Sequence, residues 1–339
     1  MRTLLSTATG GPETLVYRTD APIPEPAAGE IRIRVHAAAL NLPDLLMIED
    51  KYQDRPTRPF APGSEVAGIV DAVGAGVTGF APGQRVIAVT SSGGLAEYAL
   101  CPAGKVSHLP DGIPFDEASA LLVTYATTYY ALTERGGLAE GETLLVTGAS
   151  GGIGLAGIEL GKALGARVIA AASSDDKLAI AREAGADETL PYPSGAPLTR
   201  DQQRAFTSDL KRLAGPDGVS VILDPVGGAL VEPAFRSLGW GGRYLVIGFA
   251  AGIARLRMNL PLLKSADIRG VYWAQWILRE PEAHQRVVSA LCALHAEGRI
   301  RPRIQARFPL ERGIEALQLL ASRKAVGKIV VTVHEGAPA

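Results

Sequence analysis

A glycine-rich turn between two apolar runs constrains the fold of this chain more than any other feature. The apolar residues 144–146 lead into GASGGIG at 148–154, and a segment with helical periodicity then leads into a second apolar run at 167–172. This order predicts strand, tight turn, helix and strand, which is the βαβ unit of a parallel sheet. A helix N-terminus carries free N–H groups and a positive dipole end, so a turn without side chains lets a pyrophosphate approach closely. The stretch predicts dinucleotide binding; the alternative is a tight turn that binds nothing.

Length, charge and cysteine content narrow the classes of function. At about 150 residues per domain, a chain of 339 residues is expected to form two domains. Its 34 basic and 35 acidic residues leave a net charge of −1, so electrostatics favours neither a nucleic-acid nor an anionic-membrane partner. The two cysteines cannot form a disulfide framework, no apolar run approaches the ~20 residues of a membrane helix, and the N-terminal apolar segment is too short for a signal peptide. We expect a soluble, cytoplasmic protein.

Periodicity divides the chain into a β-rich part and an alternating part. Residues 1–120 contain short apolar runs separated by Gly and Pro, with one helix predicted at 42–48, and this pattern favours a small β-barrel. A helical pattern at 115–132 leads into the glycine turn, after which strands and helices alternate as in a doubly wound parallel sheet. Beyond the βαβ unit we predict strands at 189–192, 219–224, 243–248 and 268–272, and helices at 176–184, 201–213, 230–238 and 282–297. The tail, with a final strand at 328–333, is predicted to return to the first domain.

Five segments together resemble the medium-chain dehydrogenase/reductase superfamily, in particular its zinc-independent, zeta-crystallin-like NADPH:quinone oxidoreductase branch. They are AAALNLPDLLMIEDKY, PFAPGSEVAGIV, VTGASGGIG, GADETLPY and RKAVGKIVV, and the resemblance covers essentially the whole chain in order. It implies an α/β fold in which a GroES-like β-barrel catalytic domain (1–122 and 300–339) flanks, in sequence, a Rossmann domain with a doubly wound parallel sheet (123–299). It also implies a cofactor cleft between the domains and a homodimer formed through the Rossmann edge strand at 268–272.

The resemblance also bears on zinc, which the alcohol dehydrogenases of the superfamily use. Those enzymes have a cysteine where this chain has Asn41, and a Gly-His-Glu where it has Gly63-Ser64-Glu65. A catalytic zinc needs about three Cys, His or carboxylate ligands, and Glu65 alone cannot hold it. We therefore expect no metal site, and hydride transfer without a Lewis acid on the substrate oxygen.

Three residues are predicted to form the catalytic centre in place of zinc. By resemblance, Asn41 either holds the nicotinamide ribose or donates its amide to a developing oxyanion; the alternative is a turn or cap asparagine. Tyr52 is a candidate pocket wall and proton donor, although its phenol has an ordinary pKa near ~10 and core packing explains it equally well. Thr127 is expected to place its hydroxyl against the nicotinamide, with Thr128 as the neighbouring alternative. Asp44 is interpreted as a structural hydrogen-bond acceptor.

The end of the second strand of the βαβ unit decides between NAD and NADP. An acidic residue about 20 positions beyond the turn would bind the ribose 2′-hydroxyl, whereas this chain has SSDDK at 173–177. Hydroxyls and a lysine suit a 2′-phosphate; alternatively, these residues simply cap and start a helix. By resemblance, a tyrosine after the third strand completes an NADPH site. We expect NADPH, with Gly151, Gly152 and Ile153 at the pyrophosphate and Ser173, Ser174, Lys177 and Tyr192 at the 2′-phosphate.

The same resemblance completes the predicted site and its reaction. Val226, Gly248, Phe249 and Ala251 would flank the nicotinamide, and Lys328 would reach the cofactor from the other domain or, alternatively, merely start a strand. The expected reaction is hydride transfer from NADPH to a small-molecule conjugated carbonyl, such as a quinone, an enone or an enoyl thioester. The alternatives are an enoyl- or acryloyl-CoA reductase on the same fold and, less favoured, a non-catalytic NADPH-binding protein.

Overall fold

Two units, each held by its own contacts, make up the chain in a computed structural model that describes residues 1–193, 198–322 and 324–334. The first unit comprises Met1–Val123, Trp276–Ala296 and the chain from Pro302 onward, and the second comprises Thr124–Gln275 and Glu297–Arg301. The segment Trp276–Ala296, placed in the Rossmann domain from sequence, therefore groups with the first unit. Side-chain contacts explain this grouping, because Gln285 Nε2 donates to Val106 O at 3.1 Å and His295 Nε2 lies 2.7 Å from Glu117 Oε2.

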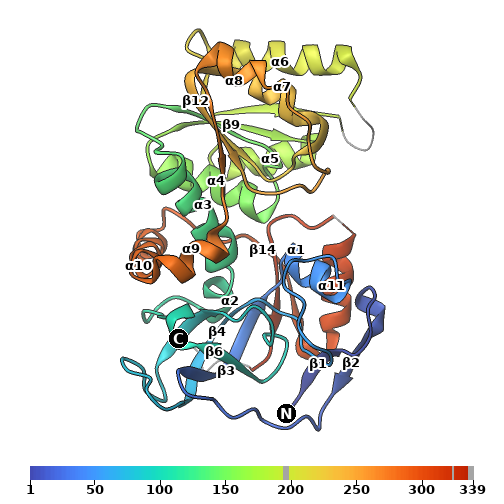
Figure 1. Cartoon of the computed structure of the whole chain (residues 1–339), viewed down its shortest axis with the longest axis vertical. Helices are drawn as coiled ribbons and strands as arrows, with labels where there is room; N and C mark the ends of the chain where they lie inside the picture. Colours follow the sequence, from blue (N-terminus) through green and yellow to red (C-terminus); the bar gives the residue numbers. More distant parts are fainter. Residues whose placement is uncertain (194–197, 323, 335–339) are drawn as a thin grey trace. The chain divides into compact units, whose positions relative to one another are not determined.

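The second unit is built on a six-stranded sheet in the order β10-β9-β8-β11-β12-β13, in which every neighbouring pair is parallel. Counted from β8, this is the order 3-2-1-4-5-6 of doubly wound dinucleotide-binding sheets, so the predicted sheet is confirmed. The winding direction reverses between β8 and β11, and ligands bind at the carboxyl ends of the strands at such a point. The strands are β8 (Thr143–Val146), β9 (Arg167–Ala172), β10 (Glu188–Pro191), β11 (Val219–Asp224), β12 (Leu238–Val246) and β13 (Asp267–Gly270) (Figure 1).

Helices cover both faces of this sheet because side chains alternate along each strand. Leu145 and Tyr244 belong to an apolar cluster that includes residues of α6, α7 and α8. On the opposite face α4 packs so closely that a Cβ at Gly157 would lie 2.6 Å from Leu223 Cδ2. The helices of this unit are α3 (Thr127–Tyr130), α4 (Gly152–Ala163), α5 (Asp175–Glu183), α6 (Arg200–Ala214), α7 (Val231–Phe235) and α8 (Asn259–Lys264).

The first unit is mainly antiparallel β structure. Its larger sheet has the order β14-β15-β3-β4-β5-β7, with β6 paired to β3, and a separate hairpin joins β1 and β2. The predicted return of the final strand is confirmed, since β15 pairs with β3 through Val330 and Ala39. The strands are β1 (Thr3–Ser6), β2 (Leu15–Arg18), β3 (Glu30–Ala39), β4 (Glu65–Val73), β5 (Arg85–Val89), β6 (Tyr98–Pro102), β7 (Val106–His108), β14 (Ile304–Pro309) and β15 (Lys328–Thr332).

Several helices accompany this sheet. The predicted helix at 42–48 is confirmed as α1 (Leu42–Ile48). The predicted helix at 115–132 is helical throughout most of its length but irregular, with α2 (Phe115–Ala118) followed by π-helical turns at Leu121–Ala126 and Ala131–Arg135 on either side of α3. The remaining helices are α9 (Trp273–Arg279), which runs from the second unit into the first, α10 (Pro281–Ala296) and α11 (Gly313–Ala321).

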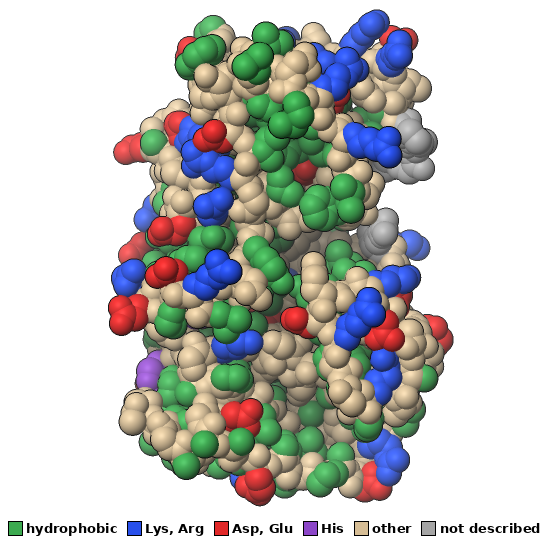
Figure 2. All heavy atoms as spheres, in the orientation of Figure 1, with side chains coloured by type: hydrophobic (Ala, Val, Ile, Leu, Met, Phe, Trp, Pro, Cys, Tyr) green, Lys and Arg blue, Asp and Glu red, His purple; other side chains and the backbone are tan. Residues whose placement is uncertain are grey.

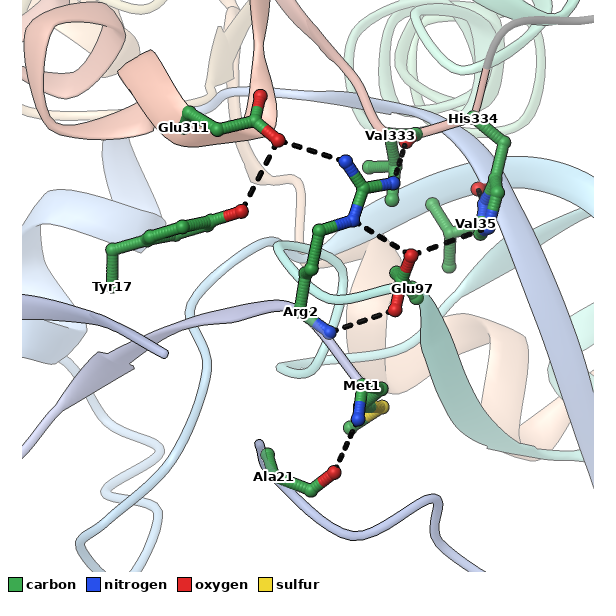
Figure 3. Close-up of polar contacts among 9 residues, drawn as sticks. All are labelled: Met1, Arg2, Tyr17, Ala21, Val35, Glu97, Glu311, Val333 and His334. Atoms are coloured by element: carbon green, nitrogen blue, oxygen red, sulfur yellow. Dashed lines mark hydrogen bonds and ion pairs between the residues drawn. The ribbon is translucent and has the colours of Figure 1, made fainter. Parts of the chain in front are cut away.

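Arg2 joins parts of the first unit that are far apart in sequence. Its guanidinium lies 2.7 Å from Glu97 Oε1 and 2.8 Å from Glu311 Oε1, and it donates to Val333 O at 3.1 Å. Figure 3 shows the side chain pointing between these three partners, with the Tyr17 hydroxyl donating to Glu311 from the other side. The N-terminal strand, the β6 region and the C-terminal segment are therefore held at one point.

The surface carries both signs of charge. On the face shown in Figure 2, Lys and Arg side chains alternate with Asp and Glu, as expected for a net charge of −1. Within the described residues, no helix has the length and apolar character needed to cross a membrane.

Candidate cofactor and active site

The glycine turn lies at the carboxyl end of β8 and opens α4. Gly148 has a φ of +58°, in the left-handed region that favours glycine. Gly154 is buried, and a Cβ there would lie 2.3 Å from Gly148 O, so a larger residue would displace the turn. Gly151 at the N-cap and Gly152 and Ile153 in the first turn are only partly buried. Because the first N–H groups of a helix lack intrahelical acceptors, this end of α4 offers donors to an anion.

Asp224, the last residue of β11, organises the loop opposite the glycine turn. Its carboxylate accepts hydrogen bonds from Thr147 Oγ1 at 2.5 Å and from the N–H groups of Val226 and Gly227 at 2.9 and 3.1 Å. The Tyr244 hydroxyl donates to its other oxygen, and the residue is 2% exposed. One buried carboxylate thus ties the ends of β8 and β11 together. Sequence reasoning passed over Asp224, although an acid closing an apolar strand before a Gly-Gly loop is the signal that marks it.

The loops after β11 and β12 are hydrogen-bonded to each other. Ala251 N donates to Val226 O at 2.8 Å, and Gly228 N donates to Gly252 O at 2.8 Å. Phe249 is 53% exposed at the outer side of these loops. Both loops follow the carboxyl ends of strands, where ligands of such sheets bind. The structure brings together the four loop residues predicted at the nicotinamide, Val226, Gly248, Phe249 and Ala251.

The residues predicted at the 2′-phosphate lie at the end of β9. Lys177 Nζ donates to Ser173 Oγ at 3.3 Å, so the ammonium and this hydroxyl are together. Ser174 is the exposed N-cap residue of α5, but its side chain makes no capping hydrogen bond. Its hydroxyl is therefore not committed to the helix, which leaves it able to meet a ligand.

Tyr192 follows β10 and lies near the glycine turn. Burial raises the pKa of its phenol, the Asp224 carboxylate raises it further, and a backbone hydrogen bond with Gly148 acts in the opposite direction. Its ring also meets that of Phe206 edge-on, with centroids 6.4 Å apart. Tyr192 is thus a partly buried neighbour of the turn that stays protonated at neutral pH.

In the first unit, a buried polar cluster joins the residue before α1 to the first residues of β4 and β15. Lys328 Nζ donates to Asn41 Oδ1 at 2.6 Å, to Glu65 Oε1 at 2.7 Å and to Leu40 O at 3.1 Å. Asn41 Nδ2 donates to Glu65 Oε1 at 2.9 Å and to Ala39 O at 3.2 Å. Lys328 is 3% exposed and Glu65 is fully buried. Lys328 Nζ thus has three acceptors and Asn41 Nδ2 has two, all within this unit.

These contacts agree with the structural alternatives given for the two residues, because Asn41 is the N-cap residue of α1 and Lys328 is the first residue of β15. To donate to a ligand, Asn41 would have to release Glu65 or the backbone carbonyl. To reach a cofactor, Lys328 would have to leave a buried carboxylate, at a cost of about 3–5 kcal/mol for breaking such a pair. In the sequence, the pair could have been recognised because each of two largely apolar strands begins with a charged residue, Glu65 in β4 and Lys328 in β15.

Asp44 and Tyr52 have largely structural surroundings. Asp44 Oδ2 accepts from Asn41 N at 2.7 Å and closes the first turn of α1, which is the structural role expected of it. The residue is fully buried, and burial raises its pKa to about 6. Tyr52 is partly buried and packs against the apolar core of the first unit. Packing therefore accounts for much of the Tyr52 side chain.

The two neighbouring threonines differ in burial. Thr127 is partly buried at the start of α3, whereas Thr128 is fully buried and its hydroxyl has no hydrogen-bond partner within the described part of the chain. The π-helical turns on both sides of α3 are a feature often found at functional sites.

The described residues show no metal centre. Across residues 1–193, 198–322 and 324–334, no three His, Cys, Asp or Glu side chains are grouped so that they could hold a metal ion. Cys101 and Cys292 are free and buried, and burial raises their pKa to about 12 and about 11. Both thiols stay protonated at neutral pH and are poor nucleophiles.

Comparison with known proteins finds a family match for each of the two units. Residues 27–111 match the alcohol dehydrogenase GroES-like domain, and residues 152–289 match the zinc-binding dehydrogenase domain. The chain is 36% identical to quinone oxidoreductase-like protein 2 of Bos taurus over 306 residues, which cover 90% of this chain and 85% of that protein. It is 31% identical to the quinone oxidoreductase of Homo sapiens over 324 residues, covering 95% and 94%. The crystal structure of Escherichia coli quinone oxidoreductase complexed with NADPH is similar with a TM-score of 0.87 at 27% identity, covering 98% of this chain and 100% of that one.

The fold and these similarities lead to one family. The parallel sheet has the strand order and glycine turn of a dinucleotide-binding domain, and a GroES-like β unit flanks it in sequence. The identity to the bovine and human proteins exceeds 30% over at least 90% of the chain. The chain belongs to the quinone oxidoreductase family of the medium-chain dehydrogenase/reductase superfamily.

Proposed function

We propose that this protein is an NADPH-dependent oxidoreductase that reduces a quinone or a related conjugated carbonyl without zinc. The observation that carries the proposal is the glycine turn at the N-terminus of α4, which lies at the switch point of a doubly wound sheet. The names of the bovine, human and bacterial relatives support the reaction class, and the NADPH complex of the bacterial enzyme supports the cofactor.

The geometry of the second unit fits such a cofactor. Gly151, Gly152 and Ile153 would hold the pyrophosphate through the N–H groups that open α4. Ser173, Ser174 and Lys177 would hold the 2′-phosphate, because the Lys177 ammonium already lies beside the Ser173 hydroxyl. Tyr192, beside the glycine turn, would cover the adenosine side of the cofactor.

The loops at the ends of β11 and β12 would hold the nicotinamide end. When bound, NADPH supplies a hydride from C4 of its nicotinamide ring. Val226, Gly248, Phe249 and Ala251 would orient that ring, and the hydroxyl of Thr127 would contact it. Asp224 keeps the first of these loops in place through its bonds to Val226 and Gly227. Rigid loops favour catalysis because they position the reacting groups in advance.

Asn41, Tyr52 and Lys328 are the proposed contribution of the first unit. The Lys328 ammonium lies 2.7 Å from Glu65 Oε1, where it would repel a metal cation, and this favours a reaction without zinc. The negative charge that develops on the substrate oxygen would then be stabilised by hydrogen-bond donors. Asn41 would provide its amide only by exchanging one of its present partners, and Tyr52 or solvent would deliver the proton.

We further propose a cytosolic homodimer formed through β13. Two buried free cysteines suit a reducing compartment. In the sheet order β13 is an edge strand paired to β12, and Ile268 is 45% exposed on it. An edge strand has unpaired backbone N–H and C=O groups, which can pair with the same strand of a second copy.

A panel of acceptors tests the function. We expect absorbance at the NADPH band to fall when the protein is mixed with NADPH and a quinone, with kcat/KM at least about tenfold higher for NADPH than for NADH because the 2′-phosphate has an ammonium partner. Treatment with EDTA should leave the rate unchanged. An enone and a short enoyl-CoA belong in the same panel. A preference for enoyl-CoA would identify a thioester reductase, and loss of activity that zinc restores would refute the metal-free mechanism.

A further inference from the structure

Glu65, the first residue of β4, uses its two carboxylate oxygens to bind different parts of the first unit. Its Oε1 accepts from Lys328 Nζ at 2.7 Å and from Asn41 Nδ2 at 2.9 Å. Its Oε2 accepts from the backbone N–H of Val123 at 2.7 Å. The residue is fully buried, so each of these bonds replaces contact with water. Glu65 therefore links the Asn41 amide to the segment around Val123.

The hydrogen bond to Val123 lies in the helical segment that directly precedes Thr127. Val123 lies in the first half of the π-helical turn Leu121–Ala126, and α3 begins at Thr127 directly after it. The early N–H groups of a helix have no acceptor within the helix. Glu65 supplies a strand-borne acceptor to a backbone N–H in this helical segment, about one helical turn before Thr127.

Lys328 binds Oε1 of Glu65, the oxygen that does not contact Val123. The ammonium neutralises a carboxylate that would otherwise be buried without a counter-charge, which is strongly unfavourable. It also binds Asn41 Oδ1 at 2.6 Å, and this determines which end of the amide faces Glu65. Two charged neighbours, together with the Ala39 carbonyl, thus hold the Asn41 amide in one orientation.

We propose that Glu65 and Lys328 are positioning residues that jointly set the placement of Asn41 and of the helical turn leading to Thr127. The inference rests on the function proposed above, in which Asn41 and Thr127 serve the nicotinamide end of the site. Neither charged residue contacts substrate or cofactor. Their effect on the reaction passes through the two side chains that they hold.

The variants Glu65→Gln, Lys328→Met and the double variant E65Q/K328M separate positioning from stability. Lys328→Met leaves an unpaired buried carboxylate and should lower Tm strongly, whereas the double variant removes both charges and should recover most of that loss. We expect kcat of the double variant to stay 10- to 100-fold below wild type. A pair with a purely structural role would recover kcat together with Tm.

Two further measurements report on positioning directly. 2′-Phospho-ADP-ribose, which lacks the nicotinamide, should bind the double variant within about twofold of its wild-type affinity, since its phosphates meet only the second unit. The primary isotope effect on kcat with C4-deuterated NADPH should rise, because a misplaced site slows hydride transfer itself. Glu65→Gln alone, which keeps the side-chain volume but offers one acceptor oxygen, should show the same changes.

Glu97→Gln is the matched control. Glu97 lies in the same unit and also accepts from a backbone N–H and a cationic side chain, both of Arg2, at 2.7 Å. This variant should lose stability and keep kcat within about twofold of wild type. Wild-type turnover in a double variant that retains the wild-type isotope effect would overturn the positioning role alone. A wild-type protein that neither binds nor oxidises NADPH would overturn the proposed function and this role with it.

Discussion

Two glycines of the same turn need the absence of a side chain for different reasons. At Gly154 a Cβ would meet only backbone atoms, namely Gly148 O at 2.3 Å and the Cα and carbonyl carbon of Ala149 at 2.6 and 2.7 Å. At Gly151 the nearest such atom is Gly148 O at 3.5 Å, an ordinary van der Waals contact. Gly154 therefore allows the turn to pack closely, whereas Gly151 leaves space in front of the N-terminus of α4.

Alanine substitutions should separate these two requirements. Gly154→Ala is expected to lower the free energy of unfolding by about 1–3 kcal/mol, because backbone must move to admit the methyl group. Gly151→Ala should cost about 0.5–1 kcal/mol, because glycine is preferred to alanine at an N-cap, and should weaken NADPH binding by about tenfold or more, because its methyl group stands where the pyrophosphate approaches. Thermal unfolding and NADPH fluorescence titration measure the two effects. Equal NADPH affinity of G151A and wild type would contradict the placement of the pyrophosphate.

Individual residues differ in how well the sequence predicts them. The glycine turn is local, so spacing alone indicates which glycines open α4. The partners of Glu65 are not local, since Lys328 is 263 positions away and meets it only when β15 pairs with β3. Asn41 looked like a free donor because its two charged partners, Glu65 and Lys328, lie far from it in the sequence.

At the scale of elements, local pattern succeeds where an element is long or clearly bounded. The predicted strand at 219–224 corresponds to β11. The predicted helix at 230–238 is wrong in extent, because the helical part ends at Phe235 and Leu238 already belongs to β12. The apolar residues there satisfy either period, and pairing of Leu238 with Val219 decides for the strand. Pairing partners of this kind lie outside any sequence window.

The edge strand β13 carries the prediction at this scale. Ile268→Arg should convert the proposed dimer into a monomer, because a charge on the shared edge opposes strand pairing. Molar mass from light scattering after size exclusion measures the change. Val16→Arg is the matched control, since Val16 is 40% exposed on β2 and Ile268 is 45% exposed on β13. A monomeric wild type, or a dimeric I268R protein, would contradict the proposed interface.

At the scale of the whole molecule, Glu159 binds two residues that lie close in sequence to the boundaries of the second unit. Glu159 Oε2, on α4, accepts from the Tyr125 hydroxyl at 2.9 Å and from Arg301 N at 2.8 Å. Tyr125 lies just after the boundary at Val123, and Arg301 is the last residue before the chain re-enters the first unit. Within the second unit, the partly buried Glu159 carboxylate therefore binds one residue near the start of the unit and one at its last boundary.

This carboxylate should make stability depend on pH. Burial raises the pKa of Glu159 from 4.5 to about 7, against the opposing effect of its two hydrogen bonds. A carboxyl with a raised pKa binds its proton more tightly when folded, so its contribution is full below its unfolded pKa and is lost as pH rises through 7. Between pH 5 and pH 8 the free energy of unfolding of wild type should fall by about 1–3 kcal/mol more than that of Glu159→Gln. Urea unfolding at several pH values measures both slopes.

Glu142→Gln is the control for this slope. Burial opposes ionisation of Glu142, but its hydrogen bond with Arg243 prevails and lowers the pKa below its usual value. Glu142 thus stays ionised from pH 5 to pH 8, and its removal should shift the stability curve without changing the slope. Parallel curves for wild type and E159Q would show that Glu159 does not titrate in this range.

The first unit is assembled from segments that are separated in the sequence, and this has a consequence for folding during biosynthesis. Arg2 and Glu65 are translated before the second unit, whereas their partners Glu311 and Lys328 are translated after it. The strands of the second unit all fall between Thr143 and Gly270, so its sheet is complete while the first unit still lacks β14 and β15. Domains generally fold as units during synthesis, usually N-terminal first. We therefore expect the reverse order here: the unit with the parallel sheet folds first, and the unit that flanks it in sequence is completed last.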